Sequence, residues 1–130
     1  MLDGPGVDRV LDLEEPLPDD FGLFAHVDCI SVLEHSRRPW LLAANLERLL
    51  ELGGTLYLQV PFVWRIHGFP NDYFRFTTEG VRVLFPQIEW TALQFVNGTP
   101  GNEVHRLDYG RLHYFPKSEV CGFGVKTCAS

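Results

Sequence analysis

The chain has 130 residues, a length that suits one domain built around one core. Apolar residues make up 45% and aromatic residues 13% of the composition, which excludes an intrinsically disordered chain. The formal net charge is −6, and Lys117 and Lys126 are the only lysines, so neither nucleic acid nor a membrane surface is an expected partner.

Targeting signals and cysteines give a consistent indication of compartment. No apolar run approaches the roughly 20 residues of a transmembrane helix. The first residues have neither the basic start nor the apolar stretch of a secretory signal. The three cysteines, Cys29, Cys121 and Cys128, are odd in number and contain no Cys-x-x-Cys pair, which predicts free thiols in a cytoplasmic protein.

The first third of the chain is predicted to contain two strands. Residues 7–13 alternate between apolar and polar types after a Gly-Pro-Gly turn, which predicts a strand. Residues 14–26 contain prolines and acidic residues and predict a loop with room for one helical turn. Residues 27–33 are nearly all apolar, as expected for a central strand covered on both faces.

The strongest local signal predicts a helix over about 39–51. Ser36 can cap this helix, Pro39 suits an early helical position, and a Gly-Gly pair ends the segment. Apolar residues recur on one helix face, at Leu42, Leu46, Leu49 and Leu50. Residues 55–60 then predict a strand, and two strands joined by a helix of this length are expected to be parallel.

The rest of the chain is predicted to add an antiparallel pair of strands. In chain order, the sequence predicts an aromatic loop at 61–76, a helix from 77 or 78 to about 85, a strand at 87–96, an irregular stretch at 97–117 that could hold a helical turn around 103–110, and a strand at 119–128. No clear crossover helix separates the last two strands, so they are expected to pair antiparallel. The whole order predicts an α/β domain with a mostly parallel sheet.

Four stretches, in this order and spacing, resemble the later part of class I S-adenosylmethionine-dependent methyltransferases of the type 11 group. Residues 7–18 resemble the strand and turn that carry an adenine-contacting acid, and residues 27–35 resemble a central strand ending in Leu-Glu-His. Residues 49–62 resemble the Leu-x-Pro-Gly-Gly turn and its following strand, with Glu-Leu in place of the usual Lys-Pro. Residues 67–77 resemble the His-x-x-Pro-x-Asp-x-x-Arg-Phe-Thr loop of one subgroup.

The resemblance does not extend to the cofactor turn. Members of the family begin with a strand and a Gly-x-Gly-x-Gly turn, followed by a second strand whose final acid holds the ribose. Here Gly4 and Gly6 precede the first predicted strand and cannot form a strand-to-helix nucleotide turn. The resemblance therefore implies an incomplete Rossmann-like methyltransferase domain over residues 1–130, truncated at its N-terminus or degenerate, with an antiparallel C-terminal strand pair.

The missing strands imply a partner. In the family order 3-2-1-4-5-7-6, the first predicted strand would lie about 14 Å from the next, which leaves unpaired backbone groups in the gap. The first strand could move in to pair with residues 27–33, a second chain could fill the gap, or the chain could be a piece of a longer protein. An exposed apolar edge favours self-association, so we expect a homodimer.

The resemblance implies S-adenosylmethionine as cofactor, held by an incomplete pocket. Asp12 would accept the exocyclic amine of adenine, Leu13 would lie against the ring, and Ser31 would complete the cofactor-binding set. An alternative interpretation of Asp12 is that it ends a strand and caps the following turn.

Two groups of polar residues follow predicted strands at the edge where open α/β sheets bind ligands. His35 could act as a base and Glu34 could orient a substrate, or the pair could cap the following helix. In the aromatic loop, His67 could take a proton. We predict that His67, His35 and Glu34 are catalytic.

The same loop also supplies the predicted substrate-binding residues, Asp72, Tyr73 and Arg75. Arg75 could clamp an anionic substrate. The alternative is that Asp72 and Arg75 form an internal ion pair that locks the loop, while the phenylalanines around them fill the core.

Other chemistries have weaker support, and we expect no metal site. The polar residues His105, Arg106, Asp108 and His113 lie near one another without tight ligand spacing. No cysteine has a histidine partner in sequence, and no serine lies in a Gly-x-Ser-x-Gly elbow.

Three functional hypotheses remain. The first is a methyltransferase-like domain that does not act alone. The second is a non-enzymatic binding or assembly module, a homodimer that reuses half of the fold. The third and weakest is a small-molecule binder using the aromatic loop.

Overall fold

The structure is a computed structural model that describes residues 4–68, 71–96 and 118–128. Its elements in chain order are β1 (Phe24–Ile30), the short 3-10 helix η1 (Leu33–His35), α1 (Pro39–Leu49), β2 (Leu50–Pro61), α2 (Thr78–Leu84), β3 (Ile88–Val96) and β4 (Glu119–Lys126). Within these ranges, no helix is long and apolar enough to cross a membrane.

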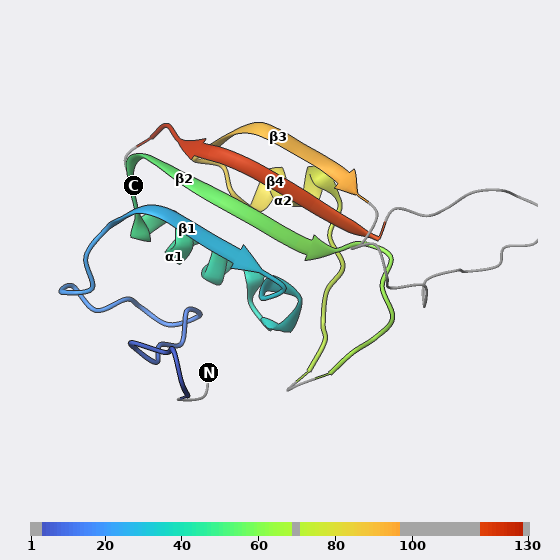
Figure 1. The fold of residues 1–130 in the computed structure, drawn as a ribbon, viewed down its shortest axis with the longest axis horizontal. Helices are drawn as coiled ribbons and strands as arrows, with labels where there is room; N and C mark the ends of the chain where they lie inside the picture. The colour runs from blue at the N-terminus through green and yellow to red at the C-terminus, as the bar shows by residue number, and fades with distance from the viewer. Residues whose placement is uncertain (1–3, 69–70, 97–117, 129–130) are drawn as a thin grey trace, which may run out of the picture.

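The strands form one sheet in the order β1-β2-β4-β3 (Figure 1). β1 pairs parallel with β2, as the predicted strand-helix-strand unit requires, with Val27 opposite Leu56 and Ile30 opposite Gln59. β4 lies between β2 and β3 and runs antiparallel to both. The predicted antiparallel pairing of the last two strands is therefore confirmed. The prediction of a mostly parallel sheet is wrong for the described residues, because β1–β2 is the only parallel pairing among them.

The β1-α1-β2 unit follows its local sequence signals closely. Pro39 begins α1, and the helix ends at Leu49, two residues before the predicted end. β2 starts at Leu50, earlier than predicted, because Leu50 pairs with Phe24 at the start of β1. Gly53 lies within this extended entry with a φ of 81°, a conformation that glycine adopts without steric cost.

The core lies on one face of the sheet. Alternate residues of β2, Leu56, Leu58 and Val60, are fully buried in a cluster that also contains residues of both helices. Figure 1 shows α1 behind β1 and β2 and α2 near β3 and β4. The opposite face is more open, because Tyr57 and Gln59 are only half-buried and Phe123 is exposed. The described residues therefore form two layers, a sheet covered by helices on one side.

Residues 7–13 do not form the predicted strand. Val7 and Val10 are exposed, and the segment ends in a turn in which the Glu15 amide donates to the carbonyl of Asp12 at 3.1 Å. The Asn45 side-chain amide donates to the carbonyl oxygens of Leu13 and Glu15. In a strand these oxygens would accept hydrogen bonds from a neighbouring strand. The local alternation was therefore overruled by contacts with α1. β1 consequently has a free edge within the described part of the chain.

Two further sequence predictions concern the stretch at 103–110 and the cysteines. The helical turn around residues 103–110, together with His105, Arg106, Asp108 and His113, lies outside the described residues. The cysteines are free, as predicted, with Cys29 buried in the core and Cys128 exposed. Burial raises the pKa of the Cys29 thiol to about 12, so this cysteine is an inert core residue.

Candidate functional site at the carboxyl edge of β1 and β2

The parallel pairing of β1 and β2 brings their carboxyl ends to the same edge of the sheet. Ser31 follows β1 with a φ of 53°, and this left-handed turn directs the chain into η1. The segment after β2 folds back over η1, because the Tyr73 amide donates to the Glu34 carbonyl at 2.7 Å. A second backbone bond, from the Phe76 amide to the Pro61 carbonyl at 2.9 Å, closes the loop. Two stretches far apart in sequence therefore share one surface.

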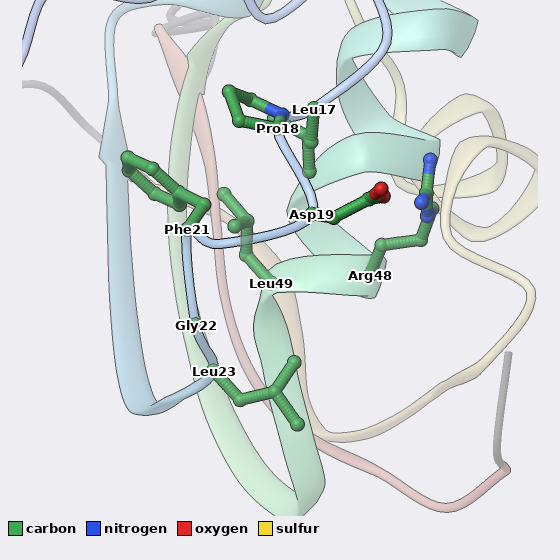
Figure 2. A pocket seen from close by; sticks show the side chains of 8 residues that line it. All are labelled: Leu17, Pro18, Asp19, Phe21, Gly22, Leu23, Arg48 and Leu49. Carbon is green, nitrogen blue, oxygen red and sulfur yellow. The ribbon is translucent and has the colours of Figure 1, made fainter.

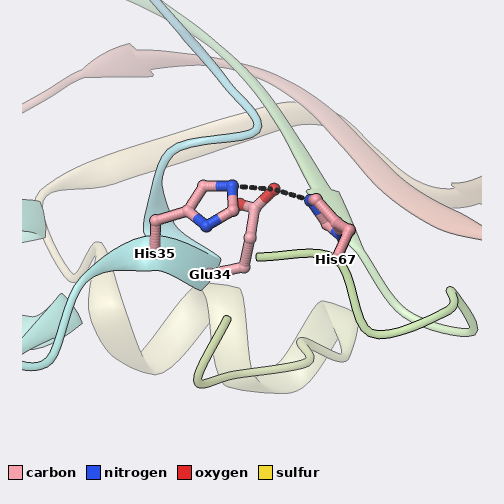
Figure 3. Close-up of side chains that lie close together, drawn as sticks. All are labelled: Glu34, His35 and His67. Atoms are coloured by element: carbon pink, nitrogen blue, oxygen red, sulfur yellow. Dashed lines mark ion pairs between the residues drawn. The ribbon is translucent and has the colours of Figure 1, made fainter. Parts of the chain in front are cut away.

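Three side chains on this surface form a group that we call the Glu34 cluster, consisting of Glu34, His35 and His67. The Nε2 atoms of His35 and His67 lie 3.7 and 3.8 Å from the same Glu34 oxygen, Oε1. Figure 3 shows the two imidazoles approaching that oxygen from opposite sides. The rings meet edge to face, with centroids 5.0 Å apart. The three residues predicted to be catalytic are therefore brought together.

The carboxylate of Glu34 is buried and accepts no hydrogen bond in the described structure. Its side chain is 1% exposed, and neither of its oxygens accepts a hydrogen bond within the described structure. Burial raises the pKa of this carboxyl, an effect that its own backbone amide and the two imidazoles oppose. Burying an ionised carboxylate that accepts no hydrogen bond is energetically costly. Such an expense is uncommon at positions that serve only packing.

The hydrogen bonds of the two histidines fix which nitrogen faces Glu34. His35 Nδ1 lies 2.6 Å from the carbonyl oxygen of Asn71, and a carbonyl only accepts, so Nδ1 carries the hydrogen. His67 Nδ1 lies 3.3 Å from the carbonyl oxygen of Arg65 and 3.3 Å from Oδ2 of Asp72, both acceptors. In the neutral form, each imidazole therefore presents the lone pair of Nε2 to the cluster.

Asp72 and Arg75 form the internal ion pair that was the structural alternative for this loop. The Arg75 guanidinium donates to both carboxylate oxygens of Asp72, and Asp72 also accepts the His67 amide at 2.8 Å. These bonds, led by those from Arg75, hold the pKa of Asp72 well below its usual range. Arg75 also donates to the carbonyls of Phe74 and Arg65. The pair locks the loop, and this use of the guanidinium accounts for Arg75 without a bound anion.

Tyr73 has a different position, at the rim of the site. Its side chain is exposed, and its hydroxyl accepts a hydrogen bond from Nε of Arg37 at 2.9 Å. Arg37 was not identified from the sequence, because it follows η1 in a polar run that looks like any solvated surface. The Tyr73–Arg37 pair is exposed, whereas the Asp72 side chain is buried and the Arg75 side chain is 26% exposed. A role for Tyr73 in substrate binding stays a prediction.

The residues predicted to bind the cofactor lie on separate pieces of structure. Asp12 is exposed and caps its own turn, since its Oδ1 accepts the Glu14 amide at 2.9 Å. Leu13 packs partly against the core. Ser31 is exposed in the turn after β1. Within the described structure no hydrogen bond or ion pair joins these three residues, so their cofactor role stays a prediction.

Glu14 anchors this segment beside the site. Its Oε1 accepts from the Ser36 hydroxyl at 2.8 Å and from the Arg37 amide at 2.9 Å, and its Oε2 pairs with Arg38. These bonds outweigh the effect of burial and lower the pKa of Glu14. Ser36, expected to cap the helix, instead helps to hold this loop, and the Arg38 position before α1 has no side-chain cap. The anchor places the turn at residues 12–15 next to the start of α1.

Two surface pockets lie near the opposite, amino edge of the same strands. One, of about 200 Å³, is formed by the loop before β1 and the end of α1 (Figure 2). It is lined by Leu17, Pro18, Asp19, Phe21, Gly22, Leu23, Arg48 and Leu49. The other, of about 430 Å³, is lined by Gly6, Val7, Asp8, Arg9, Phe21 and Phe24. Ligands of open α/β sheets bind at the carboxyl edge, so neither pocket coincides with the expected chemistry.

Comparison with known proteins identifies the fold. No protein-family model and no curated protein sequence matches the chain. Among solved structures, the chain is similar to a methyltransferase from Haloferax volcanii in complex with the methyltransferase activator Trm112. The identity is 14% and the TM-score 0.65, over 93% of this chain and 61% of that one. It is also similar to the N-methyltransferase NodS from Bradyrhizobium japonicum WM9 in complex with S-adenosyl-L-homocysteine. Here the identity is 11% and the TM-score 0.57, over 89% of this chain and 52% of that one.

These similarities define the class of fold. The chain has a methyltransferase-like α/β fold, and it spans between half and two thirds of the length of these two neighbours. At such low identity the similarity concerns the backbone and assigns no activity. Activity must be argued from the Glu34 cluster and its surroundings.

Proposed function

We propose that this chain is the acceptor-side half of an S-adenosylmethionine-dependent methyltransferase and that it does not catalyse methyl transfer alone. One observation carries the proposal. In a methyltransferase-like fold, η1 and the loop after β2 meet at the carboxyl edge of the parallel strands and place Glu34, His35 and His67 together. The sequence has no Gly-x-Gly-x-Gly turn for the methionine part of the donor, so the donor pocket is incomplete.

The residues at this edge have the properties that methyl transfer needs. Transfer from a sulfonium is a displacement, in which the protein positions donor and acceptor and accepts a proton where the acceptor carries one. The Nε2 lone pair of His67 or His35 would take that proton, and the backbone carbonyls of Arg65 and Asn71 accept from Nδ1 and keep each ring in the required tautomer. Tyr73 would contact the acceptor at the rim. Asp12, Leu13 and Ser31 would contact the adenosine part of the donor.

Calorimetric titration with S-adenosylhomocysteine tests the proposal. We expect weak, saturable binding in the millimolar range, because only part of the pocket is present. Asp12→Ala should weaken that binding by at least threefold, while Asp8→Ala, an exposed aspartate in the same segment, should leave it unchanged. The absence of heat and of a thermal shift at millimolar ligand would refute the methyltransferase proposal. Equal affinity of the Asp12 variant would refute the adenine contact.

The free edge of β1 favours a second candidate function, a homodimeric assembly module. Within the described residues β1 has a neighbour on one side only, and Phe24 and Ile30 are 42% and 48% exposed. Edge strands of this kind pair with other chains unless charges or proline block them. The Haloferax volcanii neighbour was itself solved with a protein partner, Trm112. For this chain we propose that the occupant is a second copy, whose β1 pairs antiparallel with this one across a two-fold axis perpendicular to the strand.

Light scattering at high micromolar concentration distinguishes the assembly proposal. We expect a dimer that Ile30→Lys shifts toward monomer by at least tenfold in dissociation constant, because lysine on an edge strand opposes pairing. Val83→Lys, at a more exposed apolar position on α2, serves as the control. A strictly monomeric wild-type protein would refute it. A cytoplasmic location stays a prediction in both proposals.

A further inference from the structure

The Glu34 cluster presents an electrostatic problem that its protein neighbours do not solve. Both imidazoles place their Nδ1–H on another acceptor, so their Nε2 lone pairs face a carboxylate. Three acceptor atoms therefore converge, and no donor within the described structure reaches the Glu34 oxygens. Converging acceptors repel one another unless a positive charge lies among them. We propose that Glu34, His35 and His67 form a binding site for a divalent transition-metal ion.

The spacing of the three ligand atoms fits such an ion after a small adjustment. All three lie within 4.8 Å of one another, and both imidazole nitrogens are within 3.8 Å of Glu34 Oε1. Ligand atoms bound about 2.1 Å from a tetrahedral Zn²⁺ lie about 3.4 Å apart. The two nitrogen–oxygen distances therefore need to contract by a few tenths of an ångström, and the two imidazole nitrogens, which lie within 4.8 Å of each other, must reach the same spacing. His67 is on a loop and partly exposed, so it can supply most of that movement.

The surroundings provide the second shell that metal-binding histidines require. A ligating imidazole usually donates its other N–H to a carboxylate or backbone carbonyl, which orients the ring and raises its basicity. The Arg65 carbonyl and the Asp72 carboxylate, each 3.3 Å from Nδ1, have this position for His67, and the Asn71 carbonyl has it for His35. Asp72 is in turn fixed by Arg75. The ion pair that locks the loop therefore also aligns a metal ligand.

The donor set indicates the class of metal and the kind of site. Two imidazoles and one carboxylate suit Zn²⁺, Fe²⁺, Mn²⁺ and Co²⁺, whereas Mg²⁺ and Ca²⁺ prefer oxygen ligands. Three protein ligands leave at least one coordination position open, as in catalytic rather than structural zinc sites. The imidazoles are 21% and 34% exposed, so the open position faces solvent. It would accept an oxygen or nitrogen atom of a small molecule.

The metal site uses the same Nε2 atoms that the proposed methyl transfer would use as a base, so a bound ion would occupy those lone pairs. The two proposals are nevertheless tested separately. Metal binding is measured with Zn²⁺ or Co²⁺ alone, and donor binding is measured with S-adenosylhomocysteine alone. A chain that binds Zn²⁺ but not S-adenosylhomocysteine would retain the metal site and lose the methyltransferase proposal. A chain that binds S-adenosylhomocysteine but not Zn²⁺ would retain the methyltransferase proposal and lose the metal site.

Titration of the full chain tests the inference. The protein is treated with chelator, freed of it, and titrated with Zn²⁺ by calorimetry and with Co²⁺ by visible absorption. We expect one high-affinity equivalent, Co²⁺ bands of a four- or five-coordinate ion, and a thermal shift on addition of Zn²⁺. Absence of saturable binding of either ion to the wild-type protein would overturn the proposal, whatever the variants do.

The variants locate the ion. Glu34→Gln, His35→Gln and His67→Gln should each weaken Zn²⁺ binding by at least 100-fold. His26→Gln is the matched control, because His26 also contacts an aspartate, Asp28, but lies on the open face of β1. A His105→Gln/His113→Gln double variant should bind like the wild type. Binding that survives Glu34→Gln and His67→Gln, or that disappears in either control, would overturn the assignment. Glu34→Gln keeps the test valid even if the histidine variants fold poorly, because it removes a buried charge without changing shape.

Discussion

Two buried glutamates, at opposite ends of the first two strands, differ in whether their carboxylates accept hydrogen bonds. Glu47, near the end of α1, is 2% exposed, and its Oε1 accepts the Gln87 amide at 2.8 Å. Burial raises the pKa of its carboxyl, while the Gln87 amide and the charge of Lys126 oppose that rise. Glu34, at the carboxyl edge, has comparable burial and no hydrogen-bond partner for its oxygens in the described structure.

The difference contrasts a charge that the fold uses for stability with one that we propose serves binding. Lys126 is buried with its Nζ donating to the carbonyls of Glu47 and Leu50, which lie where α1 ends, at 2.8 and 3.0 Å. It therefore satisfies the negative end of the helix dipole and joins β4 to α1. Glu34 makes no comparable stabilising contact, so the free energy needed to bury its carboxylate must be offset by other parts of the fold. We infer that the amino edge is built for stability and the carboxyl edge for binding.

The largest expected effect is at the amino edge. Lys126→Met leaves two carbonyls and the Glu47 carboxylate without their cation, which should lower the free energy of unfolding by about 3–5 kcal/mol. Urea denaturation measures this loss. Arg82→Met is the control, because Arg82 pairs with Glu79 on the surface at 3.7 Å and should cost under about 1 kcal/mol. Similar losses in the two variants would contradict the structural role of Lys126.

An intermediate effect is expected at the loop that carries His67. Asp72→Asn removes charge-assisted hydrogen bonds to Arg75 and should cost about 1.5–3 kcal/mol. The folded-state pKa of Asp72 lies below its unfolded value, so its contribution is present above about pH 4 and is lost as the pH falls further. Denaturation at pH 7 and in the acid range measures both parts. Asp28→Asn, at an exposed aspartate, should show neither, and equal behaviour of the two variants would refute the lock.

The fold was largely predictable where local and long-range signals agree. Pro39, the leucine stripe and the Gly-Gly turn define α1 and the parallel pair of β1 and β2. The alternation in residues 7–13 gave a false strand because a strand also needs a neighbour, and Asn45 takes the backbone of that segment instead. A sequence pattern cannot show which side chain will compete for a carbonyl.

The candidate site was predictable in part for the same reason. Glu34 and His35 follow an apolar strand, so their place at the carboxyl edge could be expected. Their approach to His67 depends on the path of a long loop, which is set by the Tyr73–Glu34 backbone bond. The sequence alone did not group these three residues as metal ligands, because the third member lies far along the chain. Glu47 and Lys126 were missed because burial of a charge is decided by tertiary packing.

The smallest stability effect concerns Glu34 itself. Glu34→Gln removes a buried charge that accepts no hydrogen bond, so in the presence of chelator the variant should equal the wild type or exceed its stability by about 1 kcal/mol at pH 7. Glu47→Gln should instead be destabilising, because Glu47 lies beside Lys126. Urea denaturation of the two variants compares them directly. A loss of stability in Glu34→Gln equal to that in Glu47→Gln would show that both glutamates are structural.

The dependence of stability on pH tests most directly whether the buried Glu34 carboxylate destabilises the fold when it is ionised. Its folded-state pKa lies above the unfolded value of about 4.5, so the folded state binds the proton more tightly and ionisation destabilises the fold as the pH rises. With chelator present, the free energy of unfolding should fall in the wild type relative to Glu34→Gln as the pH increases from 4.5 through the folded-state pKa. Parallel curves for the two proteins across that range would contradict the account.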